Sequence, residues 1–174
     1  MSTHATSETD TRHQPDDAPR VVHEPLPLET LMDETEDPTA GAMVVFSGTV
    51  RNHHEGHSVE AIGYSAYQPL AERVLRELEA EVCQRFPVAR CRIMHRVGEL
   101  AIGDSSVLVV VRAAHRGDAF EAARYAIDTL KERAPFWKNE RFTDGSSAYQ
   151  DGVALDGEHG AQEREEAQST GGRE

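Results

Sequence analysis

The chain has 174 residues, of which 31 are acidic and 18 are basic, so its formal net charge is −13. This acidic balance argues against a protein that binds nucleic acid or an anionic membrane. No apolar run reaches the roughly 20 residues that a membrane-spanning helix needs, and the first residues lack the basic and apolar regions of a signal peptide. We therefore expect one soluble domain located in the cytoplasm.

The acidic excess lies at the two ends of the chain. Residues 1–40 carry a formal charge of −8 and residues 143–174 carry −6, whereas residues 41–142 carry +1. Residues 1–20 and 153–174 are rich in polar residues and glycine, with too few apolar groups to offset the entropy lost on ordering. The sequence therefore predicts a folded domain at 21–152 between two disordered acidic tails.

The first half of this domain begins with a short amphipathic stretch at 26–32. The β-rich segment 42–50 (AMVVFSGTV) is typical of a largely buried strand. A polar loop at 51–58 separates it from a second predicted strand at 59–67, and the two strands could pair as a hairpin. A helix follows at 69–86, because its apolar residues recur every three or four positions.

The second half again alternates strands and helices. Apolar and polar residues alternate over 91–97, which predicts a strand with one face toward solvent. A glycine-bounded turn at 98–104 leads to 106–114, whose VLVVV run is the most apolar strand and therefore the predicted centre of a sheet. A helix at 119–133 and an extended segment at 136–142 complete an α+β or α/β domain.

Two residue pairs and one proline add detail to these elements. Asp118 and Glu121 have the spacing of a capping box at the start of the second helix. Pro135 ends that helix. Cys83 and Cys91 lie on predicted buried faces and form no CxxC motif, so neither a disulfide framework nor a zinc ribbon is expected.

Lysine is scarce, since only Lys131 and Lys138 occur among the 18 basic residues. They lie seven residues apart, and a chain reversal at Pro135 could bring both ammonium groups to one partly apolar site. Desolvation and mutual repulsion there would favour a neutral amine that acts as acid, base or nucleophile. The alternative is that both are ordinary surface lysines near a helix end.

A second candidate site lies at the junction between the central strand and the following helix. Strand-to-helix junctions commonly place ligands, and free backbone N–H groups at a helix start attract anions. Arg116 could bind a phosphate there, and His115 could donate a hydrogen bond or a proton. Alternatively, Arg116 pairs with a nearby acid and His115 is a solvated turn residue.

The polar loop 51–58 holds a third set of candidates. Three histidines in five positions, His53, His54 and His57, suggest a metal site, but no cysteine or paired carboxylate accompanies them. We expect no metal and instead consider Arg51 an anion contact at a strand end, with a solvated loop as the alternative. His95 points inward on its strand and is interpreted as a core histidine.

Four segments together resemble the large, catalytic subunit of molybdopterin synthase. They are GAMVVFSGTVRNHHEG (41–56), MHRVGELAIGD (94–104), AHRGDAFEAARYAIDTLKERAPFWKNE (114–140) and RFTDGSSAY (141–149). The third is the most specific, with AHR before the helix and LKxxxPxWKxE at its end. The resemblance covers about residues 21–152 and excludes both tails.

The resemblance implies an α/β hammerhead-like fold with an additional antiparallel sheet. It implies a sulfurtransferase of molybdenum cofactor biosynthesis that converts cyclic pyranopterin monophosphate to molybdopterin by forming its dithiolene. Sulfur comes from the thiocarboxylated C-terminus of a small ubiquitin-like partner subunit, so no further cofactor is expected. Large subunits of this family form a homodimer at the centre of a heterotetramer.

The same resemblance assigns roles to individual residues. Lys131 and Lys138 match the two lysines treated as catalytic. The positions that match substrate-binding residues, or that extend the site beyond Lys138, are Thr49, Val50, Arg51, His115, Arg116, Asn139 and Glu140. Asn139 stands where the family often has a basic residue, and Tyr149 where it often has tryptophan.

Two other functions remain compatible with the residues themselves. A lyase that forms a Schiff base on a lysine with a phosphorylated carbonyl substrate also needs a reactive lysine beside an anion site. A non-catalytic module that binds a ubiquitin-like tail would need the same surface without the chemistry.

Overall fold

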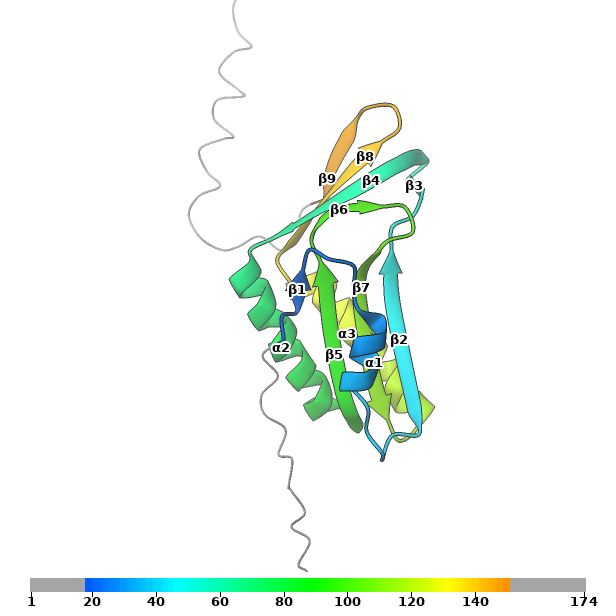
Figure 1. Cartoon of the computed structure of the whole chain (residues 1–174), viewed down its shortest axis with the longest axis vertical. Helices are drawn as coiled ribbons and strands as arrows, with labels where there is room; N and C mark the ends of the chain where they lie inside the picture. Colours follow the sequence, from blue (N-terminus) through cyan, green and yellow to red (C-terminus); the bar gives the residue numbers. More distant parts are fainter. Residues whose placement is uncertain (1–17, 151–174) are drawn as a thin grey trace, which may run out of the picture.

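The structure of the protein, a computed structural model, describes residues 18–150 (Figure 1). Within this range the helices are α1 (Leu28–Glu34), α2 (Gln68–Arg85) and α3 (Arg116–Arg133). The strands are β1 (Val21–Val22), β2 (Ala42–Thr49), β3 (His53–His54), β4 (His57–Ala66), β5 (Val88–Arg96), β6 (Gly98–Ala101), β7 (Ser105–Ala113), β8 (Phe136–Phe142) and β9 (Ser147–Gln150). The predicted α+β class with an added antiparallel sheet is confirmed.

The first sheet has the strand order β1-β5-β7-β2 and is antiparallel except for the parallel pair of β1 and β5. β7 lies inside this sheet, as its apolar run predicts, and Val109, Val110 and Val111 are fully buried. Successive side chains of a strand point to opposite faces. The consecutive burial of these valines therefore requires that both faces of the sheet are covered.

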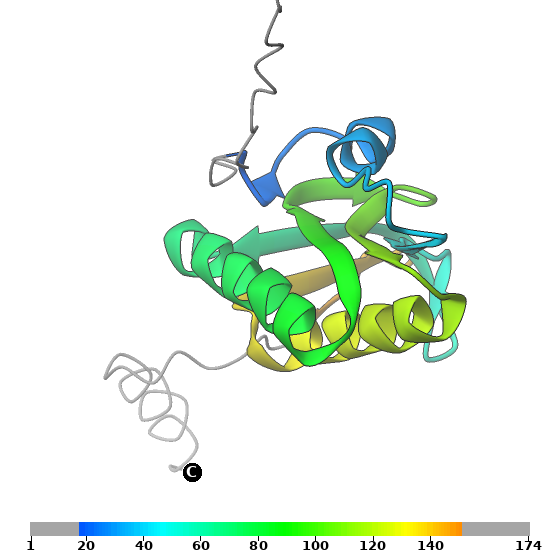
Figure 2. The same ribbon diagram turned by 90° about the horizontal axis from the view of Figure 1, so that it is seen from below.

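Helices cover the two faces unequally. α2 and α3 lie side by side on one face (Figure 2), where Leu75, Leu78 and Ala126 pack with Val109 and Val111 of β7. α1 covers part of the other face, where Leu31 packs against Val110. Burial on both faces corrects the prediction that β5 has one face toward solvent: Arg92 and Met94, expected on that face, are buried under α1.

The second sheet lies at one end of the first and has the order β3-β4-β8-β9 (Figure 1). β6 also pairs with β4, on the edge opposite β8. The expected turn at 98–104 thus contains a strand, β6. Residues 136–142 form β8, as predicted, and β8 pairs with β4 and β9.

The predicted hairpin between residues 42–50 and 59–67 is wrong. β2 pairs with β7 in the first sheet, whereas β4 pairs with β3, β6 and β8 in the second. The chain reverses within the predicted loop itself, at Glu55 and Gly56, whose φ angles are 47° and 85°. A two-residue turn with positive φ closes the short hairpin of β3 and β4, so β2 is left to pair elsewhere.

Three smaller predictions also need correction. α3 begins at Arg116, so the helix cap is His115, and Asp118 lies inside the first turn instead of capping the helix. Cys83 is exposed, whereas Cys91 is buried. Arg20, assigned to the tail, is buried and forms an ion pair of 2.8 Å with Glu79 of α2.

The remainder of the two predicted tails lies outside the described residues. Among residues 18–150, no helix is long and apolar enough to cross a membrane.

Candidate active site

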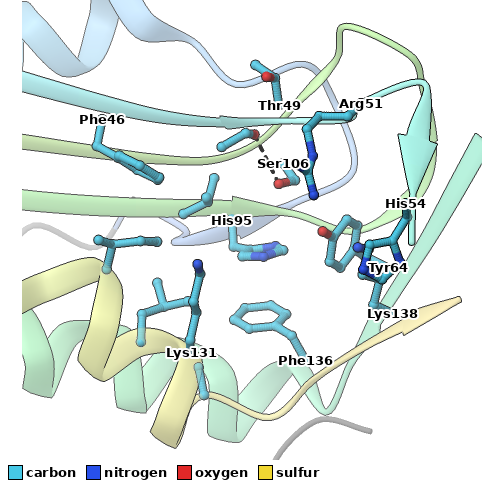
Figure 3. A pocket seen from close by; sticks show the side chains of 15 residues that line it. Phe46, Thr49, Arg51, His54, Tyr64, His95, Ser106, Lys131, Phe136 and Lys138 are labelled. Carbon is cyan, nitrogen blue, oxygen red and sulfur yellow. Dashed lines mark hydrogen bonds between the residues drawn. The ribbon is translucent and has the colours of Figure 1, made fainter. Parts of the chain in front are cut away.

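A pocket with a volume of about 480 Å³ lies where both sheets meet the C-terminal end of α3 (Figure 3). Each of the three walls comes from a different part of the chain. The first sheet contributes Phe46, Gly48, Thr49, His95, Ser106 and Val107; α3 and the turn after it contribute Ile127, Leu130, Lys131 and Ala134; and the second sheet with the segment before it contributes Arg51, His54, Tyr64, Phe136 and Lys138.

The two lysines of the chain both line this pocket. Lys131 is on the last turn of α3, and Lys138 is on β8, where it pairs in register with Tyr64 of β4. The helix ends at Arg133, and β8 starts at Phe136 after Pro135. Figure 3 shows Lys131 reaching from α3 toward His95, with Lys138 beside His54 on the strand side. The reversal at Pro135 therefore brings the lysines to one site, as predicted.

Lys138 is held by an acidic partner. Its Nζ lies 2.5 Å from Oε1 of Glu140, and Oε2 of the same carboxylate lies 2.5 Å from Nδ1 of His54. Burial of Glu140 raises its pKa, but the hydrogen bonds from Lys138 and His54 outweigh burial and hold the pKa below its usual value. Glu140 is therefore a buried carboxylate anion with both oxygens occupied.

Lys131 and Arg51 are positively charged groups of a different kind. Within the part of the chain that the structure describes, neither has an acidic group within ion-pair distance. Arg51 enters from the segment after β2, and Lys131 enters from the opposite side (Figure 3). The pocket thus offers two cations without an acidic partner, an arrangement that suits an anionic ligand.

Aromatic rings form the pocket wall between these cations. His95 stacks on Phe136 with 3.8 Å between ring centroids, and Tyr64 meets the His95 ring edge-on at 5.1 Å. Burial lowers the pKa of His95 to about 4, so its ring is neutral at physiological pH. His95 was interpreted only as a core histidine; it is buried, but it also lines the pocket.

The end of β2 gives the pocket its remaining polar groups. The pairing with β7 shifts register between Gly48 and Thr49. A Cβ atom on Gly48 would lie 2.7 Å from Cγ1 of Val107, so a larger residue would require the Val107 side chain or its strand to shift. Thr49 lines the pocket. Val50 does not, because its side chain is buried in the core of the second sheet with Val59 and Ile62.

Two other expected substrate contacts also lie outside the pocket lining. Glu140 is 1% exposed and is bound to Lys138 and His54, so it is placed to orient these groups instead of touching a ligand. Asn139 alternates with Lys138 on β8 and therefore points to the other face of the strand. Its Oδ1 is buried and has no hydrogen-bond partner among residues 18–150.

His115 and Arg116 lie at the far end of α3. They line a separate hollow with Gly41, Ala42, Ala114 and Gly117. Because Lys131 is fifteen residues after Arg116 on the same helix, about 22 Å of helix axis separates them. Within one chain, the structure does not bring these two residues to the lysines.

The histidines of the predicted loop are directed to three different partners. His53 bonds Asn52, His54 bonds Glu140, and the ring of His57 lies 5.2 Å from that of Phe142. Over residues 18–150 no group of three His, Cys, Asp or Glu side chains is placed to hold a metal ion.

Sequence reasoning missed the link between His54, Glu140 and Lys138. The contact between Lys138 and Glu140 could have been predicted, since the two residues are two apart on a predicted strand and so share a face. The position of His54 could not, because it depends on the turn at Glu55 and Gly56 that folds β3 onto β4.

Comparisons with known proteins agree with this architecture. The molybdopterin synthase catalytic subunit of Nostoc sp. is 44% identical over 77% of this chain and 82% of its own length. A crystal structure of molybdopterin synthase from Staphylococcus aureus aligns with a TM-score of 0.72 and 39% identity, over 76% of this chain and 96% of that one. A complex of subunits 1 and 2 of molybdopterin-converting factor from Helicobacter pylori shares the fold at a TM-score of 0.61 and 23% identity, over 75% of this chain and 88% of that one.

The family match covers most of the described domain. Residues 21–133 match the family described as MoaE protein, from β1 to the end of α3. The chain therefore belongs to the MoaE family, that of the molybdopterin synthase catalytic subunits.

Proposed function

We propose that the pocket of Lys131 and Lys138 converts cyclic pyranopterin monophosphate to molybdopterin. The observation that carries this proposal is the position of the two lysines, the only ones in the chain, on opposite sides of one pocket that also holds Arg51. A phosphorylated substrate needs cations, and transfer of sulfur needs an acid, base or nucleophile. The pocket supplies both kinds of group.

In this proposal the sulfur arrives from outside the chain. A small ubiquitin-like subunit inserts its thiocarboxylated C-terminus. The thiocarboxylate sulfur bonds to a carbon of the substrate, and an oxygen substituent leaves that carbon with a proton donated by an acid of the pocket. Water then cleaves the acyl–sulfur bond, which leaves the sulfur on the pterin and a carboxylate on the partner. A second thiocarboxylated C-terminus delivers the second sulfur of the dithiolene in the same way. No resident cofactor or metal is needed for this chemistry, and we expect it to take place in the cytoplasm.

The surroundings of the lysines suggest a division of roles. Lys131 and Arg51 have no acidic partner in the described chain and are available to stabilise the substrate phosphate or negative charge that develops during transfer. Lys138 is fixed by Glu140 and is suited to proton transfer at a constant position. Thr49 adds a hydroxyl beside Arg51.

The direct test is reconstitution with a thiocarboxylated partner and cyclic pyranopterin monophosphate, with molybdopterin as the measured product. We expect Lys131→Ala and Lys138→Ala each to reduce kcat by about 100-fold or more. Arg124→Ala, an exposed basic position on α3, is the matched control and should behave as wild type. Full activity in both lysine variants would instead identify a non-catalytic module, and borohydride trapping of a substrate imine on either lysine would identify a Schiff-base lyase.

The proposal includes a homodimer, in which His115 and Arg116 of one chain could contribute to the pocket of the other. The helix start at Arg116 offers free N–H groups to an anion, but it lies far from Lys131 of its own chain. If these two residues bind substrate, they complete the pocket of a second copy. One small subunit on each large subunit then makes the heterotetramer.

Hybrid dimers test this arrangement. A dimer that combines one Lys131→Ala chain with one Arg116→Ala chain would contain one pocket with both defects and one intact pocket. We expect such hybrids to regain about half of the wild-type activity, since a symmetric dimer has two equivalent sites. If Arg116 served its own chain, both pockets of the hybrid would be damaged and activity would stay as low as in the parent variants.

A further inference from the structure

The buried carboxylate of Glu140 connects Lys138 to a residue with no role in the proposal above, His54. The link crosses the second sheet: His54 belongs to β3, and Lys138 and Glu140 belong to β8. The side chains of His54 and Lys138 are 21% and 24% exposed, whereas that of Glu140 is 2% exposed. Solvent therefore reaches both ends of the link but not its centre.

The direction of the hydrogen bond from His54 follows from chemistry. A carboxylate only accepts hydrogen bonds, so Nδ1 of His54, 2.5 Å from Oε2, donates its proton. Lys138 donates to Oε1 of the same group. Hydrogen bonds with an ionised partner are about twice as strong as neutral ones, so these two contacts fix the orientation of the carboxylate.

We propose that His54 is a positioning residue for Lys138 and acts through the buried carboxylate of Glu140. The inference rests on the proposed role of Lys138 in the reaction. The donor at Oε2 fixes the rotation of the carboxylate, so Oε1 stays aligned with the lysine. The His54 donor also takes up part of the negative charge of the carboxylate. Glu140 therefore holds the Lys138 ammonium group less tightly than it would without this donor.

Other charged groups around His54 do not replace this donor. Glu55, in the adjacent turn, lies 3.9 Å from Nε2 on the far side of the ring. Arg51 and Tyr64 line the same pocket, but neither has a contact to Glu140 among the hydrogen bonds and ion pairs of the described residues. Among residues 18–150, loss of the His54 ring therefore leaves Lys138 as the only hydrogen-bond or ion-pair partner of the carboxylate.

Because the chain has only two lysines, the effect of His54 on the Lys138 amine can be measured directly. Reductive methylation with ¹³C-formaldehyde would label Lys131, Lys138 and the chain's α-amino group, and each lysine signal can be titrated by NMR in the full chain. Lys131→Arg assigns the signals. The variants to compare are His54→Ala, which removes the donor, and His54→Asn, whose amide nitrogen is as many bonds from the backbone as Nδ1. His53→Ala is the matched control, because the His53 ring bonds Asn52.

We expect the Lys138 signal of His54→Ala to titrate about half a unit to one unit higher in pH than that of wild type. His54→Asn should restore the wild-type midpoint, and the Lys131 signal should move in none of the variants. In the reconstituted reaction, His54→Ala should lower kcat by about three- to tenfold at unchanged KM, and the rising limb of its pH profile should move in the same direction as the signal.

The outcomes separate this inference from the proposed function. If the Lys138 signal of His54→Ala titrates like that of His53→Ala while Lys138→Ala is inactive, the role of His54 is overturned and that of Lys138 stands. If the signal moves and is restored by His54→Asn while Lys138→Ala keeps full activity, His54 does orient Lys138, but the catalytic role of Lys138 fails. A midpoint that moves equally in His54→Ala and His54→Asn would overturn the requirement for a donor at Oε2.

Discussion

Two of the three pocket walls, the one from α3 and the one from the second sheet, present their lysines in different ways. Lys131, on the last turn of α3, is exposed and has no acidic partner among the described residues. Lys138, on β8, is half-buried and bound to the buried carboxylate of Glu140. One wall therefore offers a mobile charge, and the other an amine whose position is set before any ligand arrives.

This difference follows from the elements that carry the residues. A lysine at a helix end extends from a single backbone segment and keeps its rotamer freedom. A lysine on a strand shares its face with the residue two positions away, and here that residue is Glu140. Pre-organisation of the strand lysine reduces the entropy lost when the site assembles around a substrate.

The largest expected effect is on the free energy of unfolding, and it comes from protonation of His95 between the two walls. His95 lies between the lysines (Figure 3), and its pKa of about 4 in the folded chain is below its ordinary value of 6.5. The unfolded chain therefore binds the proton more tightly, and the stability is present above pH 6.5 and lost as the pH falls toward 4. We expect this residue to remove up to about 3 kcal/mol of the free energy of unfolding over that range.

His95→Phe keeps a ring on Phe136 and removes the titration. Urea unfolding from pH 7 to 4 should therefore give a flatter pH dependence for this variant than for wild type. An equal slope in the two proteins would mean that His95 is not held neutral in the folded state.

Removal of each lysine should affect stability to different degrees. Lys138→Ala leaves the buried carboxylate with His54 as its partner, and we expect it to lower the free energy of unfolding by about 1–2 kcal/mol at pH 7. Lys131→Ala removes an exposed side chain and should change it by less than about 0.5 kcal/mol. Denaturant unfolding of both variants measures the contrast, and equal losses would contradict the different roles of the two walls.

Chemical reactivity gives the smallest expected difference. Under limiting reagent at neutral pH, reductive methylation should modify Lys131 at least about three times faster than Lys138, because the ion pair with Glu140 opposes release of the proton from Lys138. Peptide mapping by mass spectrometry compares the two sites in one sample. In Glu140→Gln, the two rates should approach each other; a difference that persisted would have to come from exposure alone.

The order of the two long helices and of the longer strands could be predicted from local patterns, whereas the short strands β1, β3, β6 and β9 could not. The apolar spacing of 69–86, the valine run of 106–114 and the helix stop at Pro135 all appear in the structure close to their expected bounds. These signals depend on residues within one or two turns of each other. Partition of the strands into two sheets was not predictable in this way, because β2 and β4 have compatible patterns and only the turn at Glu55 and Gly56 separates them.

The site was predictable in part for the same reason. Lys131 and Lys138 are seven residues apart with one proline between, so a single local reversal brings them together. His54 and Glu140 are 86 residues apart, and their contact depends on the pairing of β4 with both β3 and β8. His115 and Arg116 have the chemistry expected of an anion site, but the rigid length of α3 separates them from the lysines of their own chain.

By itself, the sequence determined which of the long helices and strands form and that two scarce lysines flank a helix break, because propensity, periodicity and proline act over short stretches of chain. Only the tertiary structure decided that the two lysines differ, that Glu140 holds one of them and that His54 holds Glu140. Those contacts join segments that strand pairing brings together, and a buried carboxylate obtains its partners from whichever strands lie beside it.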